Sequence, residues 1–118
     1  MIEIKCAAPD TTALLCKKAG VSGQTVLTMT ERDDLLGFVC MMQNGEEVAL
    51  TYLEAPDTPL TDALLRAALN SARSTGAKTA FIRYEPLASH AFKKGYLTGT
   101  SQTTIEIADF FAKSACKA

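Results

Sequence analysis

The spacing of apolar residues changes at Pro56 and Pro59, from strand-like runs before them to helical spacing after them. This change sets the order of the main predicted elements. Before Pro56, runs that are rich in apolar residues and partly alternating cover residues 24–54. Because proline holds the preceding residue extended and suits the first turn of a helix, the sequence predicts a helix over residues 59–75 with Thr58 as its N-cap. Apolar residues then recur at helical spacing, at Leu60, Ala63, Leu64, Ala67, Ala68 and Ala72.

Two turns divide the region before Pro56 into a predicted three-stranded antiparallel meander. The second turn is Asn44-Gly45, the strongest short-range hairpin signal, because both residues tolerate the positive φ of a type I′ turn. In the strand that follows, strict alternation places Val48, Leu50 and Tyr52 on one face. The predicted strands are residues 24–30, 35–43 and 46–54, with an acidic turn at 31–34.

The remaining elements complete an α/β prediction. A β-α-β unit has a right-handed crossover, so the strands that end at Glu54 and Tyr84 should lie side by side and parallel. The sequence therefore predicts a mixed sheet flanked by helices, in a single domain over residues 1–118. The other predicted elements are a strand at 2–6, a short helix capped by Asp10 or Thr11 and ended by Gly20, a strand at 78–84, a helix at 86–94 and a strand at 103–107.

The charge pattern excludes several classes of partner. Twelve Lys plus Arg against thirteen Asp plus Glu give a net charge of -1, with no long block of either sign. This composition lacks the basic surface that nucleic acids and acidic membranes select. No apolar run approaches the ~20 residues of a membrane span, and the first residues do not resemble a signal peptide. We therefore expect a cytoplasmic protein that binds neither nucleic acid nor membrane.

The cysteines indicate neither a metal site nor a redox motif. Cys6, Cys16, Cys40 and Cys116 are widely spaced, and His90 is the only imidazole. Zinc sites and C-x-x-C redox motifs need closely spaced ligand pairs. We expect reduced thiols and no metal, with Cys40 packed as a small apolar residue in a strand.

The order of the elements and two spaced motifs resemble the GNAT superfamily of N-acetyltransferases. The resemblance covers residues 35–107 and implies a GNAT-like fold, acetyl-CoA as the acyl donor and an amine acceptor. The first motif is Leu64-Leu65 followed by Ala72 and Gly76. The second is Glu85-Pro86-Leu87-Ala88 followed by Phe92, Gly95 and Tyr96.

Two departures from the family pattern imply a short and degenerate member. The segment that usually carries the glycine-rich pyrophosphate loop is shortened, and Pro59-Leu60-Thr61 stands at its G-x-G positions. Asp57 and Asp62 place carboxylates where a phosphate would lie. The tyrosine that protonates the leaving thiolate in many members is absent, since the matching position is Ala91 or Phe92.

The resemblance, taken with position along the chain, selects candidate site residues. Glu54 ends the central strand beside the expected cleft and is the candidate general base. On a short helix, His90 is more often a surface or helix-end residue than a base, and Phe92 and Tyr96 are most simply apolar anchors. The candidates for acetyl-CoA binding are Leu53, Ala55, Leu60, Thr61, Asp62 and Phe92.

The sequence leaves two functions open. One is a degenerate acetyl-CoA-dependent N-acyltransferase, and the other is a non-catalytic small-molecule-binding or protein-interaction domain on the same scaffold. The short N-terminal part leaves room for only one helix before the meander, so a homodimer that covers the exposed sheet is a further expectation. We favour folding of Phe110 and Phe111 back onto the core over their binding to a partner.

Overall fold

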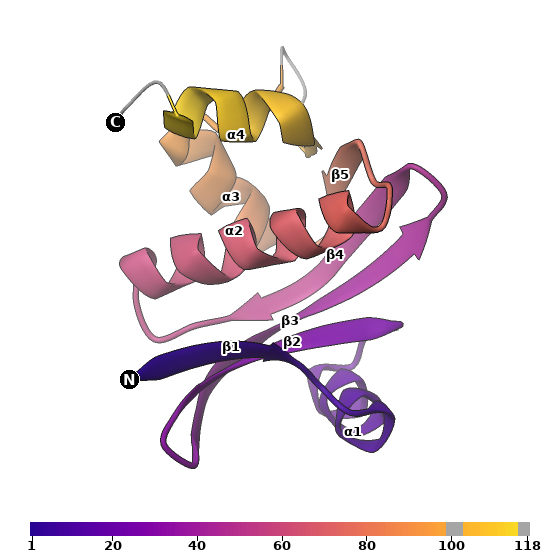
Figure 1. Ribbon diagram of the computed structural model, residues 1–118, viewed down its shortest axis with the longest axis vertical. Helices are drawn as coiled ribbons and strands as arrows, with labels where there is room; N and C mark the ends of the chain where they lie inside the picture. Colours follow the sequence, from indigo (N-terminus) through magenta and orange to yellow (C-terminus); the bar gives the residue numbers. More distant parts are fainter. Residues whose placement is uncertain (99–102, 116–118) are drawn as a thin grey trace.

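The computed structural model describes residues 1–98 and 103–115, which form a mixed sheet with helices on both faces (Figure 1). The sheet has six strands in chain order: β1 (Ile2–Cys6), β2 (Thr25–Glu31), β3 (Asp34–Asn44), β4 (Glu47–Glu54), β5 (Thr79–Ile82) and β6 (Thr104–Glu106). The helices are α1 (Pro9–Ala19), α2 (Thr58–Ser74), α3 (Glu85–Lys94) and α4 (Ile107–Ala115). Strands β4 and β5 are parallel and all other neighbours are antiparallel, which confirms the predicted α/β class and the adjacency of β4 and β5.

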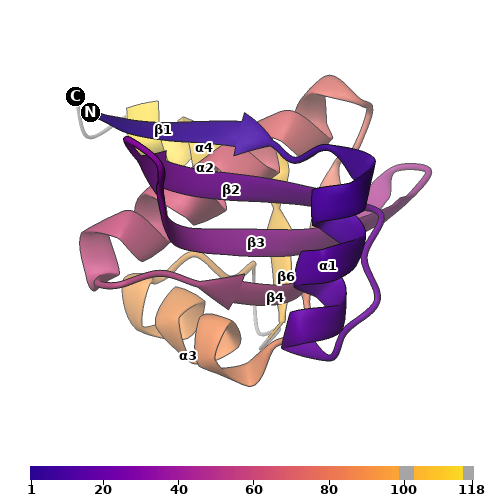
Figure 2. The same cartoon turned by 90° about the horizontal axis from the view of Figure 1, so that it is seen from below.

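Two hydrophobic clusters fill the space on the two faces of the sheet. The larger lies under α2 and α3, and the smaller lies under α1, which crosses the other face near the ends of β2 and β3 (Figure 2). None of the helices in the described ranges is both long and apolar enough to cross a bilayer. The smaller cluster contains Leu15, Cys16, Val26, Phe38 and Cys40.

Helix α2 is the main support of the sheet, as its apolar spacing predicted. Its buried residues are Leu64, Leu65, Ala68, Leu69 and Ala72, which recur every three or four positions and so form one stripe. The N-cap is Asp57, however, and not Thr58. The Asp57 carboxylate accepts a hydrogen bond from the Leu60 amide at 2.9 Å, which is the contact that an N-cap side chain makes with the third residue of the helix.

Two other local predictions differ from the structure. Helix α1 begins at Pro9 with Ala8 as its N-cap and no side-chain cap, because the fixed φ of proline already suits the first helical position. Neither Asp10 nor Thr11 caps it.

In the β3–β4 hairpin, Asn44 stays in the strand, and of the two turn residues only Gly45 has a positive φ, at 64°. A positive φ at the first turn residue alone is the pattern of a type II′ turn and not of type I′.

The C-terminal segment folds back onto the core, as favoured, but as a helix that the sequence did not predict. Strand β6 ends at Glu106, so Ile107, the last residue of the predicted strand, begins α4 instead. The Phe110 side chain is only 4% exposed. Its ring lies 5.0 Å from the ring of Tyr96, centroid to centroid, and the Arg66 guanidinium lies 5.4 Å from the Phe110 ring.

The cysteines behave as buried or isolated thiols. Cys40 is fully buried in β3, as predicted, and its sulfur lies 3.8 Å from that of Cys16. Burial, with the neighbouring Cys16, raises the pKa of Cys40 to about 12, so this thiol stays protonated and unreactive near neutral pH. Cys116 lies outside the described residues.

The two aromatic anchors predicted on or after α3 have different environments. Tyr96 packs against the larger core, but the Phe92 side chain is 69% exposed. That anchor prediction was wrong because α3 turns Leu87 and Ala91 toward the core, and Phe92 follows Ala91 on the outward side.

Replacing Phe110 should therefore destabilise the fold far more than replacing Phe92. Phe110→Ala leaves a cavity between α4 and the core and is expected to lower the free energy of unfolding by about 3 kcal/mol. Phe92→Ala, the matched control at an exposed site, should change it by less than about 0.5 kcal/mol. Urea denaturation followed by circular dichroism measures both values, and equal effects would contradict the packing of α4.

Candidate functional site

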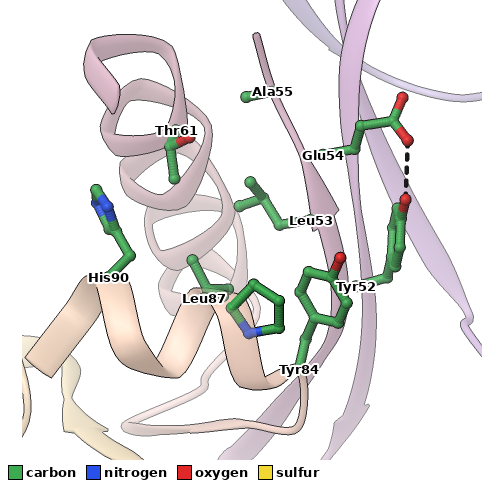
Figure 3. Close-up of a pocket in the computed structure, with 9 residues that line it drawn as sticks. Tyr52, Leu53, Glu54, Ala55, Thr61, Tyr84, Leu87 and His90 are labelled. Atoms are coloured by element: carbon green, nitrogen blue, oxygen red, sulfur yellow. Dashed lines mark hydrogen bonds between the residues drawn. The ribbon is translucent and has the colours of Figure 1, made fainter. Parts of the chain in front are cut away.

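A slot opens where β4 and β5 stop pairing. The parallel ladder runs from the pair Glu47 and Thr79 to the pair Leu50 and Ile82, and its last contact is the hydrogen bond from the Arg83 amide to the Leu50 carbonyl. Beyond this point the strands separate around a cavity of about 350 Å³ (Figure 3). The cavity is lined by Tyr52, Leu53, Glu54, Ala55, Thr61, Tyr84, Pro86, Leu87 and His90.

A β-bulge in β4 decides which side chains enter the slot. Cys40 pairs with Tyr52 and Met41 with Leu50, so Thr51 is the extra residue. The bulge reverses the alternation, because two successive residues then occupy one face. Leu53 joins Leu50 in the core under α2, whereas Tyr52 packs on the α1 face. The predicted sharing of one face by Leu50 and Tyr52 is therefore wrong.

The end of β4 is held close to β3 by a glycine. A Cβ atom at Gly37 would overlap the carbonyl oxygen of Glu54 and press on the Cα of Ala55. Glycine is thus required for the backbones to approach this closely. The contact fixes the last residues of β4, which form one wall of the slot.

The first polar group at the slot is a tyrosine–glutamate pair on the α1 face. The Tyr52 hydroxyl donates a hydrogen bond of 2.8 Å to Glu54 Oε1, and Figure 3 shows both side chains pointing away from α2. This hydrogen bond, with burial and the Glu54 charge, raises the pKa of Tyr52 to about 12. Tyr52 is therefore neutral near pH 7 and orients the exposed Glu54 carboxylate, which can accept a proton from a molecule in the slot.

The Tyr52 ring belongs to an aromatic row across three neighbouring segments. Its centroid lies 5.3 Å from that of Phe38 and 4.8 Å from that of Tyr84. Tilted contacts at these distances stabilise the row. The row holds Tyr84 at the mouth of the slot, although sequence reasoning did not select this residue.

The second polar group joins α2 to α3 beside the slot. Asp62 Oδ1 lies 2.7 Å from His90 Nε2 and accepts a hydrogen bond of 3.1 Å from the Tyr96 hydroxyl, and Asp62 Oδ2 lies 3.5 Å from Lys94 Nζ. Burial raises the pKa of Asp62, but the hydrogen bonds from His90 and Tyr96 and the charges of His90 and Lys94 outweigh it, so this pKa lies below its ordinary value. Burial and the Asp62 charge raise the pKa of Tyr96.

The predicted site residues divide into two groups. Leu53, Glu54, Ala55 and Thr61 line the slot. The other three candidates stand outside the lining: Leu60 packs against the core, Asp62 binds His90, and Phe92 lies in a separate shallow depression with Glu85, Ala88 and Ser89.

Sequence reasoning underrated His90. It lines the slot, its side chain is 16% exposed, and it pairs with an acid on another helix. The available signal was its position three residues after Leu87, which is buried in the core, because residues at this spacing share one face of a helix.

The contacts of Asp62 predict how the free energy of unfolding falls as the pH becomes acidic. A carboxyl whose pKa is lowered on folding stabilises the protein above its unfolded-state pKa, and this contribution disappears as the pH falls through the folded-state pKa. Asp62→Asn should therefore be less stable than the parent at pH 5 to 7, and the gap should shrink toward pH 3. Urea midpoints at each pH measure the gap, with Asp33→Asn in the exposed β2–β3 turn as the control. A gap that did not change with pH would contradict the assignment.

The comparisons with known proteins agree in fold and not in sequence. No protein-family model matches the chain, and no curated protein sequence matches it. Solved structures do match. A protein from Desulfovibrio desulfuricans assigned to the GNAT family of acetyltransferases is 14% identical, with a TM-score of 0.69, covering 91% of this chain and 99% of that one.

Two Escherichia coli structures give the same result. The ribosomal-protein-S18-alanine N-acetyltransferase is 14% identical with a TM-score of 0.66, covering 91% of this chain and 94% of that one. The GNAT family N-acetyltransferase YhbS, solved in complex with CoA, is 13% identical with a TM-score of 0.62, covering 92% of this chain and 82% of that one. At identities this low, the matches show only that the architecture is shared. The chain thus has the fold of the GNAT family of N-acetyltransferases.

Proposed function

We propose that this protein transfers an acyl group from a thioester, with acetyl-CoA as the reference donor, to an amine. The observation that carries the proposal is the slot between β4 and β5, with the Tyr52–Glu54 pair at its edge. The structural likeness to N-acetyltransferases, one of them solved with CoA, supports the same reaction. No comparable observation favours the non-catalytic alternative.

The slot suits a slender donor arm. Its walls are mainly apolar or uncharged, and the edge of β4 after Leu50 is no longer paired with β5. An unpaired strand edge offers main-chain N–H and C=O groups, which can bind the amide groups of a pantetheine arm as they would bind an added strand. In the proposed complex, the thioester carbonyl lies beside Leu53 to Ala55.

The acceptor amine approaches from the α1 face in this proposal. A second depression, of about 570 Å³, lies on β3 to β5 and includes Thr51 and Arg83, which adjoin the slot residues Tyr52 and Tyr84 in sequence. Its volume lies within the range of about 300–1,000 Å³ that is typical of small-molecule sites. An acceptor seated there would present its amine toward Glu54.

The proton transfers can be assigned to residues at the slot. Glu54 accepts the proton that the amine loses as the C–N bond forms, and Tyr52 holds the carboxylate in place. The C–S bond then breaks and the departing thiolate takes a proton. Tyr84 lines the slot and is the proposed donor of that proton, in place of the tyrosine missing at Ala91 or Phe92. Most of the rate enhancement would come from positioning the two reactants.

Glu54→Gln tests this assignment. Removing the base should lower kcat by roughly 10²- to 10⁴-fold and leave KM for acetyl-CoA nearly unchanged, because the carboxylate acts on the amine. The assay follows formation of the amide by mass spectrometry over a panel of amines, since the exposed Cys6 would disturb a thiol-release assay.

Glu31→Gln, at the exposed end of β2 and outside both depressions, is the matched control and should leave kcat unchanged. Unaltered turnover in Glu54→Gln would remove Glu54 from the mechanism. If the parent protein gave no amide product with any amine and no thermal shift at millimolar acetyl-CoA, the proposed function itself would be wrong. A donor at one hundred times its Kd should stabilise the fold by about 2.7 kcal/mol.

A further inference from the structure

In the proposed complex the pantetheine arm fills the slot. The diphosphate and nucleotide of coenzyme A would then lie at the end of the slot where α2 begins and where Thr61 lines it. Helix N-termini bind phosphate through N–H groups that lack partners within the helix. Here Pro59 has no N–H, and the Leu60 amide is bound to the Asp57 carboxylate at 2.9 Å. The Thr61 amide is bound to the Asp57 carbonyl at 3.0 Å. These contacts leave only the amides of Asp57 and Thr58 to meet an anion.

The charges at this end of the slot also oppose an anion. Asp57 places its carboxylate at the helix N-terminus, and Asp62 follows within the next turn. The lowered pKa of Asp62 keeps it ionised near pH 7. The nearby Lys94 is already paired with Asp62, at 3.5 Å. A diphosphate bound here would meet the Asp57 carboxylate, and the Asp62 carboxylate lies about one turn further along α2.

The lining of the slot adds no cation of its own. Among the described residues that line it, the ionisable groups are Glu54, His90 and two tyrosines, with no Lys or Arg. His90 is held by Asp62. The cavity of about 350 Å³ lies near the lower end of the range for small-molecule sites, about 300–1,000 Å³. These properties fit a neutral arm and not a polyphosphate.

We infer that the donor is recognised through its thioester-bearing pantetheine arm, and that the diphosphate and nucleotide of coenzyme A contribute little to binding. This inference rests on the proposed transfer from a thioester to an amine. It identifies the substrate class as acyl thioesters of pantetheine, whatever the far end of the arm carries.

The test compares two donors that carry the same acyl group, acetyl-CoA and S-acetylpantetheine, in the amide-forming assay and by thermal shift. The expected result is that the values of kcat/KM for the two donors lie within tenfold of each other. A preference for acetyl-CoA of more than tenfold would overturn the inference and leave the proposed function standing. Transfer and binding absent with both donors would overturn the proposed function, and the inference with it.

The variant Asp57→Ser tests the effect of the carboxylate on each of the two donors. Asp57→Ser keeps an oxygen acceptor for the Leu60 amide and so preserves the cap, but removes the negative charge. It should raise kcat/KM for acetyl-CoA by about two- to fivefold and leave S-acetylpantetheine unchanged, since the charge acts only on the diphosphate. An equal change for both donors would contradict the role given to the carboxylate. Asp33→Ser, which removes a carboxylate from the exposed β2–β3 turn, is the matched control and should alter neither value.

Discussion

The site depends on the point at which two parallel strands lose contact. Strands β4 and β5 pair from Glu47 to Leu50, and the chain after Ile82 then turns into α3. Helix α3 lies beside the gap, where Leu87 and Ala91 pack it against the larger core. The separation is thus a property of the packed fold, and the slot exists before any ligand arrives.

Each wall of the slot is fixed by a different kind of contact. On the β4 side, a bulge at Thr51 and the close approach of Gly37 to Glu54 set the backbone. On the helical side, Asp62 ties α2 to α3. The polar side chains at the slot also lie on two sides. The Tyr52–Glu54 pair lies on the α1 face of the sheet, and Asp62 with its partners lies between α2 and α3. The proton transfers that we propose and the support of the slot therefore involve different residues.

Much of the fold could be predicted from the sequence because its signals are local. The proline pair and the apolar spacing of residues 59–75 predicted α2, and alternation predicted the meander. The bulge could not be predicted, because Val48 to Leu53 alternates as an ordinary strand does. Helix α4 was missed because it follows β6 directly, with no turn signal between them.

The candidate site was predictable only in part, for a similar reason. Glu54 and its neighbours were found because strand ends beside a crossover meet at one edge of the sheet. Tyr84 and His90 were not selected, since the contacts that place them at the slot are with Tyr52 and Asp62, which are distant in sequence. Packing between elements, which a single sequence does not record, decides such positions.

The sequential order of the sheet has a consequence for how the molecule assembles. Each strand pairs with the one before it along the chain, and β2, β3 and β4 are joined by short turns, so these three strands can pair as they leave the ribosome without a long loop to close. The crossover through α2 then joins β4 to β5. The slot is accordingly completed late, once α3 has docked on a platform that is already in place.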